Sequence, residues 1–187
     1  MTLKLAKRLQ ARQAGKISLA IFDELFEKRS VINQKLLRDI FRNTTNMRIR
    51  EKIANYYTAD KRKRDAKVIG FLNRSAVEKF NANPASRESS LRLLIYLARE
   101  GETRTIRGLS LGVRDSSKTH RRVALLGLRE FSKRGNPSAL PALAEGVKDK
   151  DEKNRELALD GLKDLYAHGN TKAMKLYEEY KQKEGRL

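Results

Sequence analysis

Apolar residues recur along this chain with the spacing of helices that bury one face, and in its second half whole sets of residues return every 34 positions. The clearest sets consist of leucines, glycines and arginines: Leu94, Leu128 and Leu162; Gly101, Gly135 and Gly169; Arg87, Arg121 and Arg155. Such a period is typical of proteins in which each repeat is one helix pair that packs on its neighbours. The pattern therefore predicts an all-α, right-handed α-solenoid of stacked antiparallel helix pairs.

Each repeat is predicted to hold a longer outer helix and a shorter inner helix. The first outer helix is expected over residues 86–99, and Gly101 ends it because glycine readily adopts the left-handed conformation at a helix C-terminus. The first inner helix is expected over residues 103–114. The predicted outer-helix core is, repeat by repeat, Ser90, Leu91, Leu94, Leu97 and Ala98; Ala124, Leu125, Leu128 and Phe131; Ala158, Leu159, Leu162 and Leu165. The predicted inner-helix core is Ile106, Leu109 and Val113; Leu140, Leu143 and Val147; Met174 and Tyr177.

Residues 1–80 match the repeat only loosely and are predicted to form basic N-terminal helices in degenerate pairs, before the repeats of residues 81–187. Their apolar positions have helical spacing and predict this core: Ile17, Ala20, Ile21, Leu25 and Phe26; Leu36, Leu37, Ile40 and Phe41; Ile49, Ile53, Ala54 and Tyr57. Near the end of this region, Ser75 and Glu78 have the spacing of a capping box, which predicts a short helix over residues 76–80.

The formal net charge of +19 bears on the partner rather than on the fold. So large an excess favours an anionic partner, such as nucleic acid, anionic lipid or an acidic protein. The charge is unevenly distributed, since residues 1–80 contain 20 Lys and Arg against 8 Asp and Glu, whereas residues 148–187 contain 10 against 9. The basic surface is therefore predicted to lie in the N-terminal region and the first repeat.

Candidate phosphate-binding residues fall in two groups. In the first inner helix, Arg104, Arg107 and Arg114 are spaced to lie near one face, opposite the predicted core. The equivalent positions hold Ser138, Pro141 and Lys148 in the second repeat, and Lys172, Lys175 and Gln182 in the third. The N-terminal candidates are Lys7, Arg8, Arg48, Arg50, Lys61, Arg62, Lys63, Arg64 and Lys67. The alternative is that these cations are ordinary solvated residues.

The stretch GNPSALPALAEGVKD, which begins at Gly135, and the stretch RELALDGLKDL, which begins at Arg155, resemble a HEAT-like repeat of the phycobilisome-lyase type, an armadillo-like fold. The resemblance covers residues 86–180 and is most specific in the middle repeat. Tetratricopeptide repeats share the 34-residue period, but their signature of an aromatic residue before Leu-Gly and Tyr is missing here.

Paired aspartates and arginines add to this resemblance. Asp115 precedes Arg121 by six residues, as Asp149 precedes Arg155, and both pairs resemble the ladder that ties one turn of a HEAT array to the next. The resemblance implies that Asp115 lies near Arg121 or near the next arginine, Arg155.

The sequence offers little for catalysis. It contains no cysteine, and its two histidines, His120 and His168, lie at predicted helix ends without a partner at metal-ligand spacing. The acidic group Asp149, Asp151 and Glu152 lacks the glycine and the distal glutamate of a calcium loop. We therefore expect a protein that is not an enzyme, uses no cofactor and binds no metal.

These observations predict a cytoplasmic, non-catalytic nucleic-acid-binding protein that holds structured RNA or a ribosomal particle, rather than DNA, through phosphate contacts. Two alternatives remain. One is a protein scaffold with an acidic partner, and the other is a DNA glycosylase of the HEAT-like-repeat type, which the absence of tryptophan disfavours. No segment approaches the ~20 apolar residues of a membrane span. No small-molecule substrate is indicated.

Overall fold

The computed structural model describes residues 66–77, 84–183 and 185, together with separate positions nearer the N-terminus. Those positions are 20, 22, 23, 37, 39, 40, 44, 46, 48, 49, 52, 53 and 56. The chain forms two compact units, Met1–Val68 and Ile69–Leu187. All regular structure in the described residues is helical, as the predicted all-α class requires.

In the first unit, a few described positions test the predicted helices. The predicted core residues that are described and buried are Leu37, Ile40, Ile49 and Ile53. Ala20 was expected in the core but is exposed, and Phe22 is fully buried instead. These two residues lie on nearly opposite sides of a helix, so the orientation that buries the larger phenylalanine exposes the alanine. The other core positions predicted for residues 1–57 lie outside the described residues.

The helices from residue 66 onwards follow one another with short connections. They are α5 Ala66–Ser75, α6 Pro84–Arg99, η4 Thr103–Thr105, α7 Ile106–Gly112, α8 Lys118–Ser132, η5 Pro137–Ala139, α9 Leu140–Gly146, α10 Glu152–Ala167 and α11 Thr171–Lys183. The elements labelled η are single turns of 3-10 helix. The sequence placed the end of the N-terminal region after residue 80, whereas the second unit begins at Ile69, within α5.

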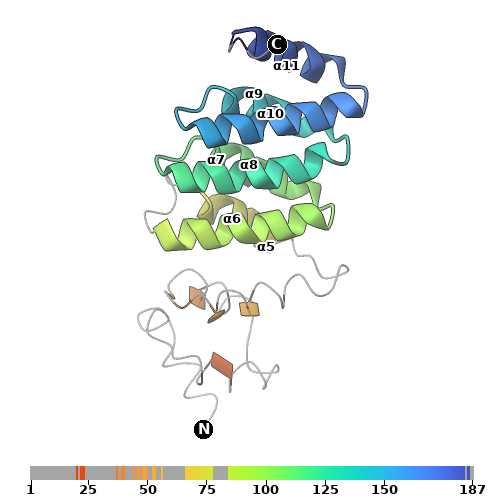
Figure 1. Ribbon diagram of the computed structural model, residues 1–187. Coiled ribbons are helices and arrows are strands. Elements are labelled where there is room, and N and C mark those ends of the chain that lie inside the picture. Colours follow the sequence, from red (N-terminus) through yellow and green to blue (C-terminus); the bar gives the residue numbers. More distant parts are fainter. Residues whose placement is uncertain are drawn as a thin grey trace. The chain divides into compact units, whose positions relative to one another are not determined.

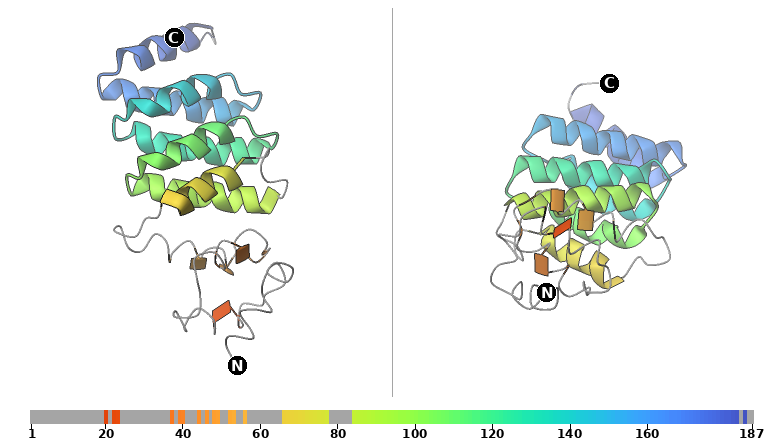
Figure 2. Two further views of the ribbon diagram at one scale, coloured as in Figure 1. Left: turned by 180° about the vertical axis from the view of Figure 1, so that it is seen from behind. Right: turned by 90° about the horizontal axis from the view of Figure 1, so that it is seen from below.

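The helices of the second unit lie in two layers (Figures 1 and 2). The long helices α6, α8 and α10 lie side by side, with α8 packed against both of the others, and we call them the long-helix layer. On their other side lie α5, α7 and α9, which we call the short-helix layer. The short helix α7 packs against α6 and α8, α9 packs against α8 and α10, and α11 packs against α10. Helix α8 is therefore held by the short helices before and after it, and α10 is held by α9 and α11.

The predicted core of the long helices is confirmed at every position. Leu94, Leu128 and Leu162, which are equivalent in the 34-residue repeat, have no exposed surface. The period therefore identifies the side of each long helix that faces the interior.

The core of the short helices differs from the prediction by one position at their start. Leu109, Val113, Leu143 and Val147 are buried as predicted, but Ile106, Leu140, Met174 and Tyr177 are only half-buried. The fully buried residues are Thr105, Ala139 and Ala173, each one place earlier than predicted. In the first two repeats the helix begins with a 3-10 turn, which rotates about 120° per residue instead of 100° and so changes which residue points inward.

Each long helix ends in the same glycine turn, as predicted. Gly101, Gly135 and Gly169 have φ values of 83°, 67° and 81°, in the left-handed region that favours glycine. The next residue's N–H closes the turn by donating to a carbonyl five residues earlier, as Glu102 does to Leu97 at 2.9 Å. This is the hydrogen bond of a Schellman motif, which satisfies carbonyls at the end of a helix.

Two predicted helix boundaries are wrong. Helix α6 begins at Pro84 rather than at residue 86, because proline is well suited to a first helical turn, where its missing N–H costs nothing. The helix predicted over residues 76–80 does not begin at Ala76, since Ala76 and Val77 are not helical, and its residues 78–80 lie outside the described residues. Ser75 has a different place from the one predicted. It is the last residue of α5, and the N–H of Ala76 still donates to the carbonyl of Leu72 at 2.9 Å.

Candidate nucleic-acid interface

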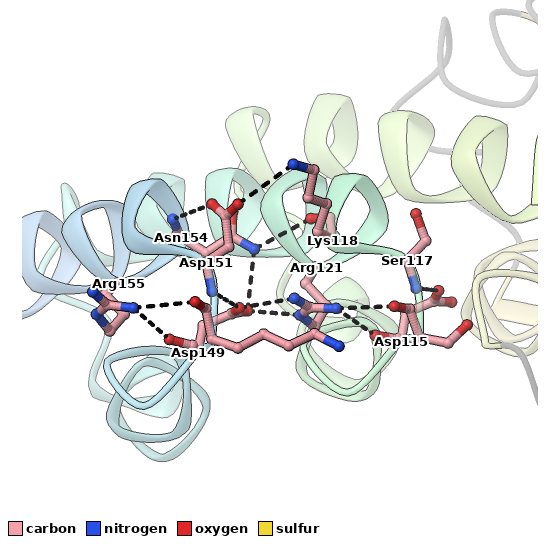
Figure 3. Close-up of polar contacts among 10 residues, drawn as sticks. Asp115, Ser117, Lys118, Arg121, Asp149, Asp151, Asn154 and Arg155 are labelled. Atoms are coloured by element: carbon pink, nitrogen blue, oxygen red, sulfur yellow. Dashed lines mark hydrogen bonds and ion pairs between the residues drawn. The ribbon is translucent and has the colours of Figure 1, made fainter.

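The repeats are joined by arginines that extend from a long helix to the loops after two successive short helices (Figure 3). Arg121, on α8, donates from Nε and Nη2 to the carboxylate of Asp149 at 2.7 and 2.8 Å. Its Nη1 donates to the backbone carbonyls of Asp115 and Ser116, both at 3.1 Å. Arg155, on α10, repeats the second contact, with Nη1 donating to the carbonyl of Asp149 at 3.0 Å.

The predicted ladder is present, but its carboxylates bind different arginines. Asp115 lies near Arg121, as predicted, through its backbone carbonyl. Its carboxylate instead lies 3.0 Å from Nε of Arg87, and both side chains are at least 95% buried. Each of these arginines therefore pairs with the aspartate that follows it by 28 residues, at the end of its own helix pair.

The surroundings of Asp149 stabilise its charged form. Besides the two bonds from Arg121, its carboxylate accepts hydrogen bonds from the backbone N–H of Asp151 at 2.9 Å and from the Asn154 side chain at 3.1 Å. Burial alone raises the pKa of this carboxyl, but the hydrogen bonds outweigh burial and lower the pKa to about 2. The same hydrogen bond to Asp149 raises the pKa of Arg121.

The two histidines lie in different environments. His120 is 3% exposed, and its Nδ1 lies 3.1 Å from the carboxylate of Asp115, in the place that Asn154 takes beside Asp149. No partner for His120 was predicted from the sequence, because this contact depends on how the loop after α7 folds. His168 is exposed, and its Nδ1 lies 2.9 Å from the carbonyl of Asp164 at the end of α10.

The three arginines predicted to form a basic row are all exposed, and α7 positions them. We call Arg104, Arg107 and Arg114 the arginine row. Arg104 lies in η4, Arg107 in α7, and Arg114 two residues after α7 ends. Helix α5 is tied to the same segment by Asn73, whose Nδ2 donates to the carbonyl of Arg104 at 2.9 Å. The start of the arginine row, at Arg104, is therefore held in place by η4 and by the neighbouring helix α5.

Two members of the arginine row already bind carboxylates, which the sequence did not indicate. Arg104 donates from Nε and Nη2 to the two oxygens of Glu102, both at 2.7 Å. Arg114 donates from Nε to both oxygens of Glu145, on α9, at 2.7 and 2.9 Å. The side chain of Arg107 has no hydrogen-bond or ion-pair partner among the described residues.

The exposed cations of the long-helix layer are in several cases neutralised by carboxylates of the same layer. Arg129, on α8, binds Asp160 and Asp164 of α10 at 2.9 and 3.0 Å. Lys133, directly after the end of α8, binds Glu130 of α8 at 3.1 Å. These pairs leave less positive charge available for a ligand on this layer.

A hollow between the starts of α8 and α10 is lined by residues of both charges. They are Lys118, Thr119, Arg122, Asp151, Glu152, Lys153 and Asn154. Within it, Nζ of Lys118 lies 3.7 Å from the carboxylate of Asp151. Three basic and two acidic side chains therefore share the hollow, the same balance of charge as in the arginine row with Glu102 and Glu145.

Most of the N-terminal candidates lie outside the described residues: Lys7, Arg8, Arg50, Lys61, Arg62, Lys63 and Arg64. The side chain of Arg48 is exposed. Lys67 lies in α5, and its side chain is not described.

The part of the chain that the structure describes lacks two further features. No group of three or more histidine, cysteine, aspartate or glutamate side chains there could hold a metal ion. No helix there is long and apolar enough to cross a membrane.

Comparison of the chain with models of known protein families and with curated proteins found no match to either. The interpretation of this surface therefore rests on the chemistry of its own residues.

Proposed function

We propose that this chain is a HEAT-like, right-handed α-solenoid that binds nucleic acid without catalysis, with structured RNA or a ribosomal particle as its partner. The observation that carries the proposal is the arginine row, Arg104, Arg107 and Arg114, exposed around one short helix of a protein with a net charge of +19. Contacts to phosphate supply most of the affinity of sequence-independent nucleic-acid binding.

The chemistry of arginine suits this ligand. Its planar guanidinium can donate two parallel hydrogen bonds to one phosphate, which the ammonium of lysine cannot do. Arg107 is available for such a contact. Arg104 and Arg114 have side chains 47% and 68% exposed. The pair of Arg114 with the half-exposed Glu145 is screened by water and contributes little to stability, whereas Glu102, beside Arg104, is only 9% exposed. A phosphate can therefore replace the carboxylate readily at Arg114, and at Arg104 it must compete with a carboxylate that is largely buried.

Few apolar anchors accompany the row. Protein interfaces depend on a few large side chains, often aromatic, that fill pockets in the partner. Near the row the structure exposes Leu111, while Tyr96, Leu126 and Tyr166 lie on the long helices. Double-stranded RNA is recognised largely through its phosphates and 2′-hydroxyls, which require polar contacts rather than anchors. This favours structured RNA over an acidic protein.

The proposal is tested by filter binding of the full chain to a synthetic RNA hairpin across a salt series. Arg107→Gln should weaken binding and lower the slope of log affinity against log salt by about 0.7 to 0.9, the effect of one lost phosphate contact. Lys172→Gln is the matched control, because Lys172 is also exposed, lacks an ion-pair partner among the described residues and lies in the nearly neutral last repeat. The control should change neither quantity appreciably.

Other outcomes would contradict the proposal in different ways. Equal losses from the two variants would mean diffuse charge attraction without a defined site. Absence of RNA binding even at low salt would exclude the nucleic-acid function and leave the scaffold with an acidic partner. Purification from a cell lysate with and without nuclease then identifies the partner, and ribosomal RNA that disappears with nuclease is the result we expect.

A further inference from the structure

Glu102 and Glu145 bind two of the three arginines of the row, and neither of these carboxylate–arginine pairs recurs among the described residues at the equivalent positions of the other repeats. Glu102 accepts a hydrogen bond from the backbone N–H of Arg104 at 3.1 Å and so caps the turn η4. The equivalent residues of the next two repeats are Asn136 and Asn170, which cap their own turns with an amide oxygen at 3.0 Å. A neutral side chain therefore serves the capping role, and the charge of Glu102 serves something else.

The pairing of Glu145 with an arginine is also particular to one repeat, because the glutamate at the equivalent position of the next repeat, Glu179, lies 4.0 Å from Lys175 of its own helix. Glu145 extends from α9 to Arg114 beyond the end of α7, and its side chain is 39% exposed. The equivalent residue in the preceding repeat is the exposed Leu111, which cannot form such a pair. The exposed pair between Arg114 and Glu145 contributes little to stability, because water and salt screen the attraction between two exposed charges.

The two carboxylates change the electrostatics of the row substantially. Each stands within hydrogen-bond distance of an arginine and cancels its charge, so Arg107 alone gives the row net positive charge. An incoming phosphate is attracted by the arginines and repelled by the carboxylates, and it must displace a carboxylate to form a paired contact with Arg104 or Arg114.

We propose that Glu102 and Glu145 act as internal competitors for phosphate, limiting the affinity of the arginine row so that only a ligand presenting several phosphates at once binds it. This inference rests on the proposed nucleic-acid function and names the residues that regulate that site. A single phosphate gains little by displacing one carboxylate. A nucleic acid already held by Arg107 places further phosphates beside the other two arginines.

The test measures binding of a synthetic RNA hairpin to Glu102→Gln and Glu145→Gln variants of the full chain. Glutamine keeps an oxygen that can cap η4, so Glu102→Gln should fold normally. Each variant should bind roughly 2- to 10-fold more tightly at low salt, with a salt slope steeper by about 0.7 to 0.9, because one more arginine becomes available to phosphate.

The matched control is Glu130→Gln. Glu130 lies on the long-helix layer, where it pairs with Lys133 at 3.1 Å and with Arg99 at 3.6 Å, so its replacement releases cations away from the row with the same change in net charge. Glu130→Gln should leave the salt slope unchanged. The gain from Glu145→Gln should disappear when Arg114→Gln is added, because the released arginine is then gone.

The outcomes separate this inference from the function on which it rests. Wild-type protein that does not bind the hairpin at low salt overturns the proposed function. If the wild-type protein binds the hairpin but Glu102→Gln and Glu145→Gln bind it no more tightly than Glu130→Gln, only the role of the two carboxylates is overturned. Weaker binding by Glu145→Gln also overturns that role, since the carboxylate would then orient Arg114 rather than compete for it.

Discussion

Arg121 and Asp149 are a buried ion pair between two repeats, with side chains only 8% and 2% exposed. Breaking such a pair from one side is costly, because the remaining charge stays buried without its partner. The pair also receives hydrogen bonds from Asn154 and from backbone groups, which hold the loop after α9 against α8. At the scale of single residues, these contacts fix the distance between successive repeats.

The lowered pKa of Asp149 predicts a pH dependence of stability. A carboxyl whose pKa falls from 3.8 to about 2 on folding stabilises the fold above pH 3.8, by on the order of 2 kcal/mol, and this contribution is lost as the pH falls through about 2. Asp149→Asn should therefore lower the free energy of unfolding at pH 7, and its difference from wild type should narrow below pH 4. Urea denaturation at several pH values measures this.

The control for this experiment is Asp160→Asn, whose carboxylate is 52% exposed and binds Arg129. Its effect should stay below about 0.5 kcal/mol at neutral pH. A difference between wild type and Asp149→Asn that is as large at pH 2.5 as at pH 7 would contradict the prediction.

Leu128 lies in α8, between α6 and α10, and has no exposed surface. Leu128→Ala should cost roughly 2 to 5 kcal/mol of unfolding free energy, because it removes buried methyl groups and leaves a cavity. Lys172→Ala, at an exposed position, should cost under about 0.5 kcal/mol. Chemical denaturation measures both, and comparable losses would mean that the core positions have been wrongly assigned.

At the scale of the helical elements, the glycine turn after a long helix ends that helix, and at Gly135 it also lies against the end of the next long helix. Gly135 has a positive φ, and a Cβ added there would lie 3.0 Å from the ring of His168 in the next repeat. Gly169 has a similar φ, but nothing lies within 4 Å of its added Cβ. The two glycines therefore share a backbone requirement and differ in packing.

This difference can be measured by replacing each glycine with alanine. Gly169→Ala should cost about 1 to 2 kcal/mol, for the left-handed conformation alone. Gly135→Ala should cost more, because His168 must also move. Gly70→Ala, inside α5 with nothing within 4 Å of the added Cβ, should be neutral or stabilising by up to about 1 kcal/mol. Equal losses at Gly135 and Gly169 would show that the contact with His168 has no energetic effect.

The sequence predicted these elements well where a feature depends only on the spacing of residues within one helix. The 34-residue period located the long helices, their buried leucines and their terminal glycines, because all of these depend on local spacing. It misplaced the start of the short-helix core, where a 3-10 turn shifts the buried position from Ile106 to Thr105.

The polar contacts of the site were harder to predict, because they join residues distant in sequence. Arg121 binds the carboxylate 28 residues ahead of it, and Arg114 binds a glutamate 31 residues ahead. Residues 28 or 31 positions apart are not neighbours on one helix, so only the stacking of successive repeats brings these groups together. The ion pair of Arg104 with Glu102 is local, and its signal was the change from asparagine to glutamate at the equivalent position of the first repeat.

Over the second unit as a whole, packing is uneven from one end to the other. Helix α8 packs against both neighbouring long helices and buries residues along its whole length, whereas the only fully buried residue of α11 is Ala173. Helices at the end of such an array open more readily than those in the middle, because they have a neighbour on one side only.

Hydrogen exchange should reveal this gradient. Amides of α11 should exchange faster than those of α8, and α10 should be intermediate, since opening of α11 does not require the central helices to separate. Mass spectrometry of proteolytic fragments after exchange at neutral pH resolves the three helices. Uniform protection across them would mean that the second unit opens as one cooperative block.

The 28-residue span of the arginine contacts also bears on how such a chain can lengthen. An in-frame copy of residues 118–151, inserted after Asp151, would carry its own arginine and aspartate, and the copied arginine would again lie six residues after an Asp149 carbonyl. By the same spacing, Lys183 occupies the place where the next aspartate would stand. Gene duplication within the array thus preserves the contacts of Arg121 with its two aspartates, whereas a unit added after residue 183 would meet a lysine in place of the acidic partner.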